Sequence, residues 1–206
     1  MADDYECRFS FQDGWVGLTL EGGTRAEAMG LAGAVMREFD PSGLSVDSRT
    51  LFDDLVDRAM GLNSDDPIMT AAYYTPGVVA LADLRVDSYG EDGVPRPSPS
   101  EVTPLLLDWS NATIAGDPEV TYLDHAAGQA VRVHALVRVK GMFGQRRPLG
   151  EFVKYAVFPS GFDSIVVVTV SWQRVHEHDE LIRITDDLVA GMQVVPVEAE
   201  SRGTED

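Results

Sequence analysis

Residues 129–140 read QAVRVHALVRVK, and their alternation is the clearest structural signal in the chain. Alanine or valine occupies the odd positions from 131 to 139. The even positions carry Arg132, His134, Arg138 and Lys140, and only Leu136 interrupts them. A period of two is typical of a β-strand, so we expect one apolar face and one wet, basic face.

Strand-like segments surround this stretch at hairpin spacing, at residues 119–123, 149–158 and 164–175. An amphipathic helix is then predicted at residues 179–192, where Leu181, Ile184, Leu188 and Met192 recur at helical spacing. Strands that follow one another without intervening helices favour an antiparallel sheet. We therefore expect the second half of the chain to form such a sheet, closed by a C-terminal helix.

The first half adds further elements. Asp13-Gly14 predicts a tight hairpin between strands at residues 5–12 and 15–20. Thr24 and Glu27 form a capping-box pattern before one helix, and Ser48 is the expected N-cap of a second. A second hairpin is expected at residues 68–89, around Pro76-Gly77.

Together these elements predict an α+β fold in which an antiparallel β-sheet is packed between helices, as an α/β/α sandwich. We expect residues 1–196 to form a single domain. Residues 197–206 are expected to be an acidic disordered tail.

The composition limits the classes of partner. The chain has 206 residues, with 34 acidic and 16 basic side chains and a net charge of −18. This charge repels phosphate backbones and anionic lipid headgroups, so we expect neither nucleic acid nor a membrane as a partner. A single cysteine, Cys7, excludes an intramolecular disulfide, and the N-terminus lacks the pattern of a secretory signal. We therefore expect a cytoplasmic protein, and a homo-oligomer is compatible with the sequence.

Residues 119–175 depart from the acidic character of the rest, with seven basic and four acidic side chains. Arginine suits the recognition of carboxylate or phosphate groups, so this basic face predicts binding of an acidic protein partner or a small anion. The alternatives are pairing with the protein's own acidic helices or with a second copy of the chain. The predicted partner-binding residues are Arg132, Arg138, Lys140, Arg146 and Arg147.

The chain lacks a nucleophile elbow, a P-loop, a dinucleotide glycine fingerprint and paired C-x-x-C motifs. We therefore favour a non-enzymatic interaction or accessory protein and expect no cofactor. The alternative is a small-molecule-binding or metal-dependent enzyme with a site near His176, His178 and Asp179. The same residues also suit a strand-to-helix junction whose acids cap the helix. A pocket for an apolar ligand between sheet and helix is a further possibility.

Residues 128–133, 164–172 and 187–192 carry a pattern that resembles the PsbP-like superfamily, over a region of residues 119–193. The resemblance implies an antiparallel sheet between helices and a binding or assembly role, as in a photosystem subunit and a nuclear-transport factor of that superfamily. Actinobacterial lipoproteins of this fold are also similar. They carry an export signal and a lipidated cysteine, whereas no apolar run precedes Cys7.

Overall fold

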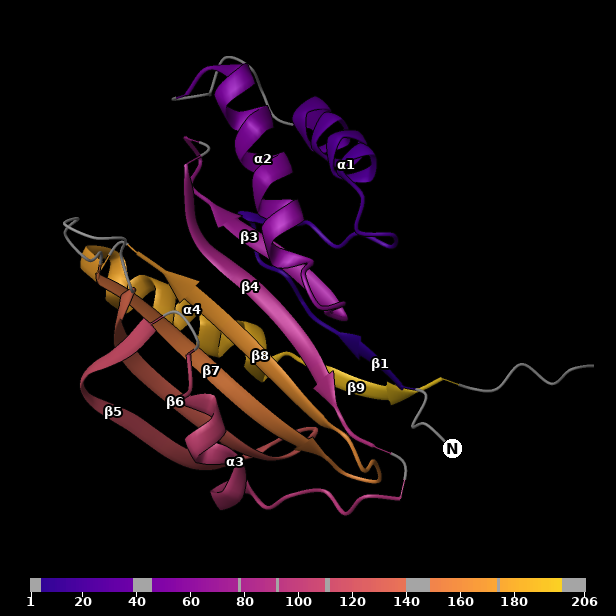
Figure 1. Cartoon of the computed structure of the whole chain (residues 1–206), viewed down its shortest axis with the longest axis vertical. Coiled ribbons are helices and arrows are strands. Elements are labelled where there is room, and N and C mark those ends of the chain that lie inside the picture. Colours follow the sequence, from indigo (N-terminus) through magenta and orange to yellow (C-terminus); the bar gives the residue numbers. More distant parts are fainter. Residues whose placement is uncertain are drawn as a thin grey trace, which may run out of the picture.

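The computed structural model describes residues 5–38, 46–77, 79–91, 93–109, 112–139, 149–173 and 175–197. At its centre lies a seven-stranded sheet with the strand order β2-β3-β4-β8-β7-β6-β5 (Figure 1), and every neighbouring pair is antiparallel. The strands are β2 (Trp15–Gly17), β3 (Met69–Tyr74), β4 (Ala80–Tyr89), β5 (Ala112–His125), β6 (Gly128–Val139), β7 (Leu149–Pro159) and β8 (Ile165–Trp172). The predicted run of late antiparallel strands is confirmed.

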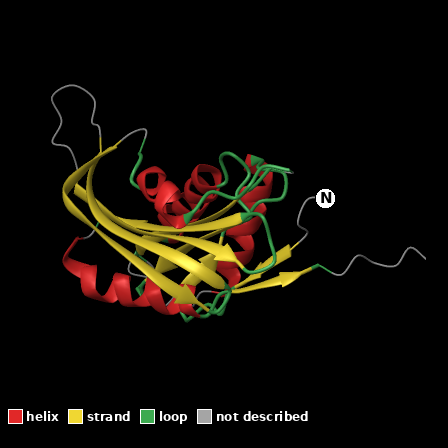
Figure 2. Cartoon of the chain, turned by 90° about the horizontal axis from the view of Figure 1, so that it is seen from below, coloured by secondary structure: helices red, strands yellow, loops and turns green. Residues whose placement is uncertain are grey.

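Helices lie on both sides of the curved sheet (Figure 2). They are α1 (Arg25–Glu38), α2 (Ser48–Leu62), α3 (Pro99–Leu106) and α4 (His178–Ala190). Leu181 and Leu188 of α4 join a core with Val153 on one face, whereas Val102 of α3 joins a core with Phe152 on the other. The α+β fold with an antiparallel sheet between helices is therefore confirmed.

Helices α1 and α2 cover the same face of the sheet as α3, and they pack at the β2–β3 end, where they share a core with Ala72. Ala72 lies opposite Asp83, Asp83 opposite Ser171, and Ser171 opposite Phe152. Directly opposed residues of antiparallel strands point to one face, so α1, α2 and α3 lie on one side and α4 on the other. Helix α2 packs against β3 and β4, whereas α3 packs against β6 and β7.

The helix starts follow local capping chemistry. At α1, the Thr24 hydroxyl accepts a hydrogen bond from the Glu27 amide at 3.2 Å, and the Glu27 carboxylate accepts one from the Gly22 amide at 3.0 Å. This is the predicted capping pattern. The N-cap of α2 is Asp47 rather than Ser48, because the Asp47 carboxylate accepts hydrogen bonds from the amides of residues 49 and 50. None of the helices in the described part of the chain is both long and apolar enough to cross a membrane.

The predicted hairpin of residues 5–20 is wrong. Gly14 does lie in a turn, with φ +99°, but the strands on its two sides separate. Strand β1 (Tyr5–Arg8) pairs with β9 (Gln193–Pro196) in a two-stranded ribbon that joins the two ends of the described chain (Figure 1). Strand β2 pairs instead with β3 at the edge of the large sheet. Residues 198–206, which make up most of the predicted tail, lie outside the described residues.

Candidate functional site

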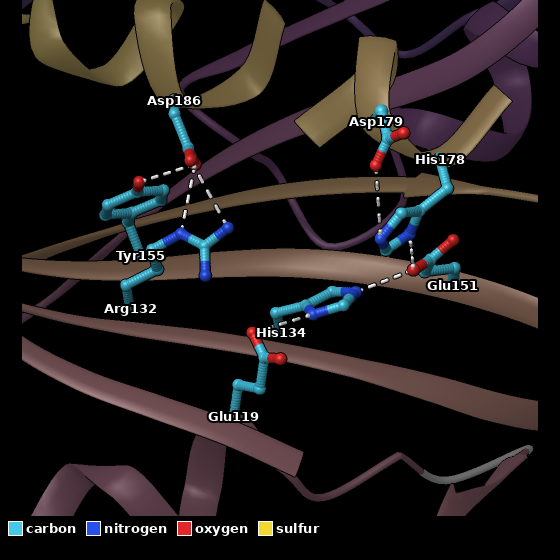
Figure 3. Close-up of polar contacts among 8 residues, drawn as sticks. All are labelled: Glu119, Arg132, His134, Glu151, Tyr155, His178, Asp179 and Asp186. Carbon is cyan, nitrogen blue, oxygen red and sulfur yellow. Dashed lines mark hydrogen bonds and ion pairs between the residues drawn. The ribbon is translucent and has the colours of Figure 1, made fainter. Parts of the chain in front are cut away.

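The basic face predicted for β6 lies beneath α4. Arg132 and His134 point towards this helix, and their side chains are only 14% and 11% exposed. The expectation of a wet face is therefore wrong at these two positions, because the C-terminal helix packs on the same side of the strand. The result is a polar layer between the sheet and α4 (Figure 3).

One part of this layer is an ion pair between strand and helix. Arg132 donates from Nε to Asp186 Oδ1 at 3.0 Å and from Nη2 to Oδ2 at 3.3 Å, and the Tyr155 hydroxyl donates to Oδ1 at 2.7 Å (Figure 3). Burial opposes the charge of Arg132, but the hydrogen bonds and charge of Asp186 raise its pKa. Burial is also the main reason why the pKa of Tyr155 is raised. For Arg132, the alternative of pairing with the protein's own acidic helix is thus realised.

The remaining residues of the predicted basic surface have different positions. Arg138 is exposed near the end of β6. Lys140, Arg146 and Arg147 lie outside the described residues. A binding surface formed by these side chains stays a prediction.

The second part of the layer is centred on Glu151 of β7, which is 1% exposed. Its Oε1 lies 2.6 Å from His134 Nε2 and 2.5 Å from His178 Nδ1 (Figure 3). Its Oε2 accepts a hydrogen bond from Trp172 Nε1 at 2.8 Å. A buried carboxylate of β7 is thus surrounded by two imidazoles and an indole that come from three other segments, β6, β8 and the start of α4.

The predicted metal-binding residues separate in the structure. His178 belongs to the group formed with His134 and Glu151, which is the one cluster of potential metal ligands in the described part of the chain. His176 is 72% exposed, and its Nε2 faces Glu177 at 3.4 Å. Asp179 is fully exposed, and its Oδ1 lies 3.9 Å from the outer nitrogen of His178. Of the three residues predicted to bind a metal, His176, His178 and Asp179, only His178 therefore belongs to this cluster.

His125 has a structural position at the β5–β6 turn. Its Nδ1 accepts a hydrogen bond from the Ala127 amide at 3.0 Å, and its Nε2 contacts the Val189 carbonyl at 2.7 Å. Because one ring nitrogen accepts and the other donates, the ring links the turn to the end of α4 as a neutral imidazole.

A cavity of about 730 Å³ lies on the opposite face of the sheet, between α3, residues 90–91 and 94–97, and strands β4, β7 and β8. Aliphatic side chains form much of its wall. They include Val94, Val102, Leu105, Leu106, Ile165 and Val167. A volume of this size is within the range of small-molecule sites in proteins.

Lys154 of β7 lines the floor of this cavity. Its Nζ lies 4.4 Å from the ring centroid of Trp109 and 5.3 Å from that of Phe152. Burial lowers the pKa of Lys154 to about 8, although Asp108 and Asp87 oppose this effect. The ammonium group is therefore held against aromatic faces in a partly desolvated position.

Two arginines that also line the cavity are already engaged. Arg85 Nε donates to the Asp87 carboxylate oxygens at 2.9 and 3.0 Å. Arg96 Nη1 donates to the carbonyl oxygens of Pro159 and Phe162, both at 2.8 Å. Lys154 has no hydrogen bond or ion pair of this kind within the described ranges.

A second hollow, of about 880 Å³, lies between α1 and the β2–β3 edge. Its lining includes Trp15, Leu31 and Tyr73, and its charged residues in the described part of the chain are the acids Asp13 and Glu38. The combination of apolar walls and a partly buried lysine ammonium therefore distinguishes the cavity at Lys154 from this second hollow.

Sequence reasoning did not identify Glu151 or Lys154. Both interrupt an otherwise largely apolar strand, and this strand is buried on both faces. A charged side chain inside such a run is uncommon without a partner, which is the signal that could have marked them. Their partners on other elements lie 17 to 45 residues away in sequence, so the pairing itself has no local signature.

Fold and site together define an α+β protein with a polar layer under α4 and an amphipathic cavity under α3. No protein-family model matches this chain, and no curated protein matches it by sequence. Similar solved structures include LpqN of Mycobacterium tuberculosis, described as involved in cell envelope biogenesis, with 10% identity and a TM-score of 0.48. That match covers 94% of this chain and 86% of LpqN.

Cyanobacterial PsbP from Synechocystis sp. PCC 6803 is similar over 94% of both chains, with 9% identity and a TM-score of 0.46. The Ran-binding protein Mog1p of Saccharomyces cerevisiae has 11% identity and a TM-score of 0.35, and the match covers 65% of this chain and 82% of Mog1p. The expected resemblance to PsbP-like proteins is thus confirmed as a likeness of fold. At these identities it concerns the fold alone.

Proposed function

We propose that this protein is a non-enzymatic binding protein that holds a small amphipathic anion in the cavity beneath α3. The observation that supports this proposal is the position of the Lys154 ammonium, 4.4 Å from the Trp109 ring at the floor of a cavity with largely aliphatic walls. An anionic head group would pair with Lys154, and an aliphatic tail would contact α3 and β8. A few polar groups in an apolar pocket are typical of small-molecule sites.

The charges around the cavity favour one anionic group rather than several. Arg85 and Arg96 already donate to Asp87 and to backbone carbonyls, so Lys154 is the cation that a ligand can engage without breaking these bonds. Asp87 and Glu91 also line the cavity, and their negative charges disfavour a polyanion such as a nucleotide. A carboxylate with an alkyl chain supplies a single negative charge for Lys154 and an apolar tail for the aliphatic walls.

Binding of an acidic protein partner through Arg138, Lys140, Arg146 and Arg147 stays a hypothesis of second rank. Arg132, which was the centre of that predicted surface, is engaged by Asp186. The cavity therefore offers the better supported site for an anion.

The test compares two probes that differ in charge, octanoate and 1-octanol, by isothermal titration calorimetry with the full chain. We expect octanoate to bind more tightly than 1-octanol. Lys154→Met should weaken octanoate binding roughly tenfold or more, because a hydrogen bond to a charged group contributes about 1.5–3 kcal/mol. Binding of 1-octanol should stay the same or become tighter.

Two further variants locate the binding. Leu105→Glu places a carboxylate on the cavity wall at an exposed position of α3, so it should repel octanoate without disturbing the core. Arg138→Met removes an exposed cation from β6 and should leave octanoate binding unchanged. Absence of octanoate binding, or equal octanoate affinities of the wild type and Lys154→Met, would contradict the proposal.

A further inference from the structure

The cluster around Glu151 has the donor set of a metal site. His134 Nε2, Glu151 Oε1 and His178 Nδ1 lie within 4.8 Å of one another. They come from β6, β7 and the first residue of α4, so three separate elements converge on one point. Two imidazoles and one carboxylate are the protein ligands of many zinc sites with an open fourth position.

The charge of Glu151 supports this assignment. The side chain is 1% exposed, and a buried carboxylate requires compensation. No lysine or arginine forms an ion pair with Glu151 in the described part of the chain. Two neutral imidazoles would supply hydrogen bonds but no positive charge, whereas a divalent cation would supply it.

The outer nitrogens of both imidazoles provide a second, independent observation. His134 Nδ1 faces Glu119 Oε2 at 3.4 Å, and His178 Nε2 faces Asp179 Oδ1 at 3.9 Å (Figure 3). A histidine that binds a metal through one nitrogen commonly directs the N–H of the other to a carboxylate. His134 has this arrangement at hydrogen-bonding distance, and at His178 the carboxylate lies on the same side of the ring but 3.9 Å away.

For two neutral rings, the number of N–H groups favours a bound cation. A neutral imidazole carries one N–H group. If both inner nitrogens donate to Glu151, both outer nitrogens present lone pairs to carboxylates, which is repulsive. If both inner nitrogens bind a cation, both outer nitrogens carry N–H groups directed at carboxylates, which is attractive.

Binding of a zinc ion requires the ligand atoms of the cluster to move apart only slightly. Zinc lies about 2.0–2.2 Å from nitrogen and oxygen ligands, so tetrahedral ligand atoms are roughly 3.4 Å apart. The contacts of 2.5 and 2.6 Å at Glu151 Oε1 must therefore widen by about 0.8 Å. His178 can widen its own contact with Glu151 and admit the ion, because its side chain is 40% exposed at the start of α4. Trp172 Nε1 holds the other oxygen of Glu151 in place.

We propose that His134, Glu151 and His178 form a binding site for a divalent transition-metal ion such as Zn²⁺, with Glu119 and Asp179 orienting the two imidazoles. This site lies on the α4 side of the sheet, so it is independent of the anion cavity on the α3 side.

The decisive experiment is a Zn²⁺ titration of the chelator-treated wild-type chain, followed by long-range ¹H–¹⁵N NMR of the imidazoles. The chain has four histidines, and two of them, His125 and His176, serve as internal controls. We expect one equivalent of Zn²⁺ to shift His134 Nε2 and His178 Nδ1 and to leave His125 and His176 unchanged. Absence of a shift at His134 and His178, or a shift centred on His176, would overturn the proposal.

Calorimetry with Zn²⁺ on variants tests the ligands separately. His134→Ala and Glu151→Gln should each weaken Zn²⁺ binding by much more than tenfold, since even residues that only orient ligands contribute roughly 10- to 100-fold. His176→Ala is the matched control, because it removes an exposed imidazole two residues from His178, and it should change the affinity by less than twofold. Equal effects of His176→Ala and His134→Ala would refute the assignment. If His134→Ala fails to fold, the wild-type NMR result decides by itself.

Discussion

Replacing Lys154 with methionine should stabilise the folded protein at neutral pH, even though it removes the cation at the floor of the cavity. Burial lowers the pKa of Lys154 from its usual 10.5 to about 8. A separation of roughly 2.5 between the pKa values of the unfolded and folded states corresponds to about 3 kcal/mol. Methionine keeps the apolar stem, so Lys154→Met should raise the unfolding free energy at pH 7 by about 3 kcal/mol.

The pH dependence distinguishes this cause from a simple gain in packing. Below pH 8 the lysine is charged in both states, and the full penalty is present. Between pH 8 and pH 10.5 the unfolded state holds more protons than the folded state, so the unfolding free energy of the wild type rises with pH. The advantage of Lys154→Met should therefore decline by about 3 kcal/mol over this interval.

Urea unfolding of the wild type and Lys154→Met, at several pH values from 7 to 11, measures this difference. The chain has two lysines, Lys140 and Lys154, so the Cε resonances give the pKa of Lys154 directly once the variant assigns the signal. A stability difference that does not change with pH, or a lower stability of Lys154→Met at pH 7, would refute the reasoning.

Three further outcomes follow from the packing. Arg132→Ala should lower the unfolding free energy by about 2 kcal/mol, because it leaves the half-buried Asp186 carboxylate on α4 without a cation and with only the Tyr155 hydroxyl as a donor. Arg183→Ala, at an exposed pair on the same helix, should cost under about 0.5 kcal/mol. Gly128→Ala should cost about 3 kcal/mol or more, since a Cβ there would lie 2.1 Å from a backbone carbonyl oxygen at φ +148°. A Cβ at Gly30 in α1 meets nothing within 4 Å, so Gly30→Ala should stabilise the fold by about 0.5–1 kcal/mol. Thermal unfolding of the two variants measures this difference. Burial raises the pKa of the Cys7 thiol to about 11, so iodoacetamide at pH 8 should modify this thiol slowly in the folded protein and rapidly in urea. Fast labelling of the folded protein would contradict the burial of Cys7.

Local patterns in the sequence were sufficient for much of the fold. The alternation of residues 129–140 predicted β6, and the capping box of Thr24 and Glu27 predicted the start of α1. The leucine spacing of residues 181–188 predicted the buried face of α4. These features are encoded within a few residues, because side chains repeat every two positions in a strand and every 3.6 in a helix.

Contacts between distant segments were not accessible in this way. The sequence around Asp13-Gly14 favoured a hairpin, but β1 pairs with β9, nearly 190 residues away, because the two ends of the chain meet beside the sheet. A strand's own sequence does not specify its partner when several apolar edges compete.

The candidate sites show the same difference between local sequence patterns and contacts of distant segments. The sequence by itself determined that β6 would carry arginine and histidine on one face and that His178 would lie at the start of the last helix. Only the tertiary structure decided that α4 covers this face, that Asp186 pairs with Arg132, and that Glu151 meets both His134 and His178. It also decided that Lys154 faces a cavity. The physical reason is that a side chain's type and direction are set locally, whereas its partners are set by sheet register and by the face on which each helix packs.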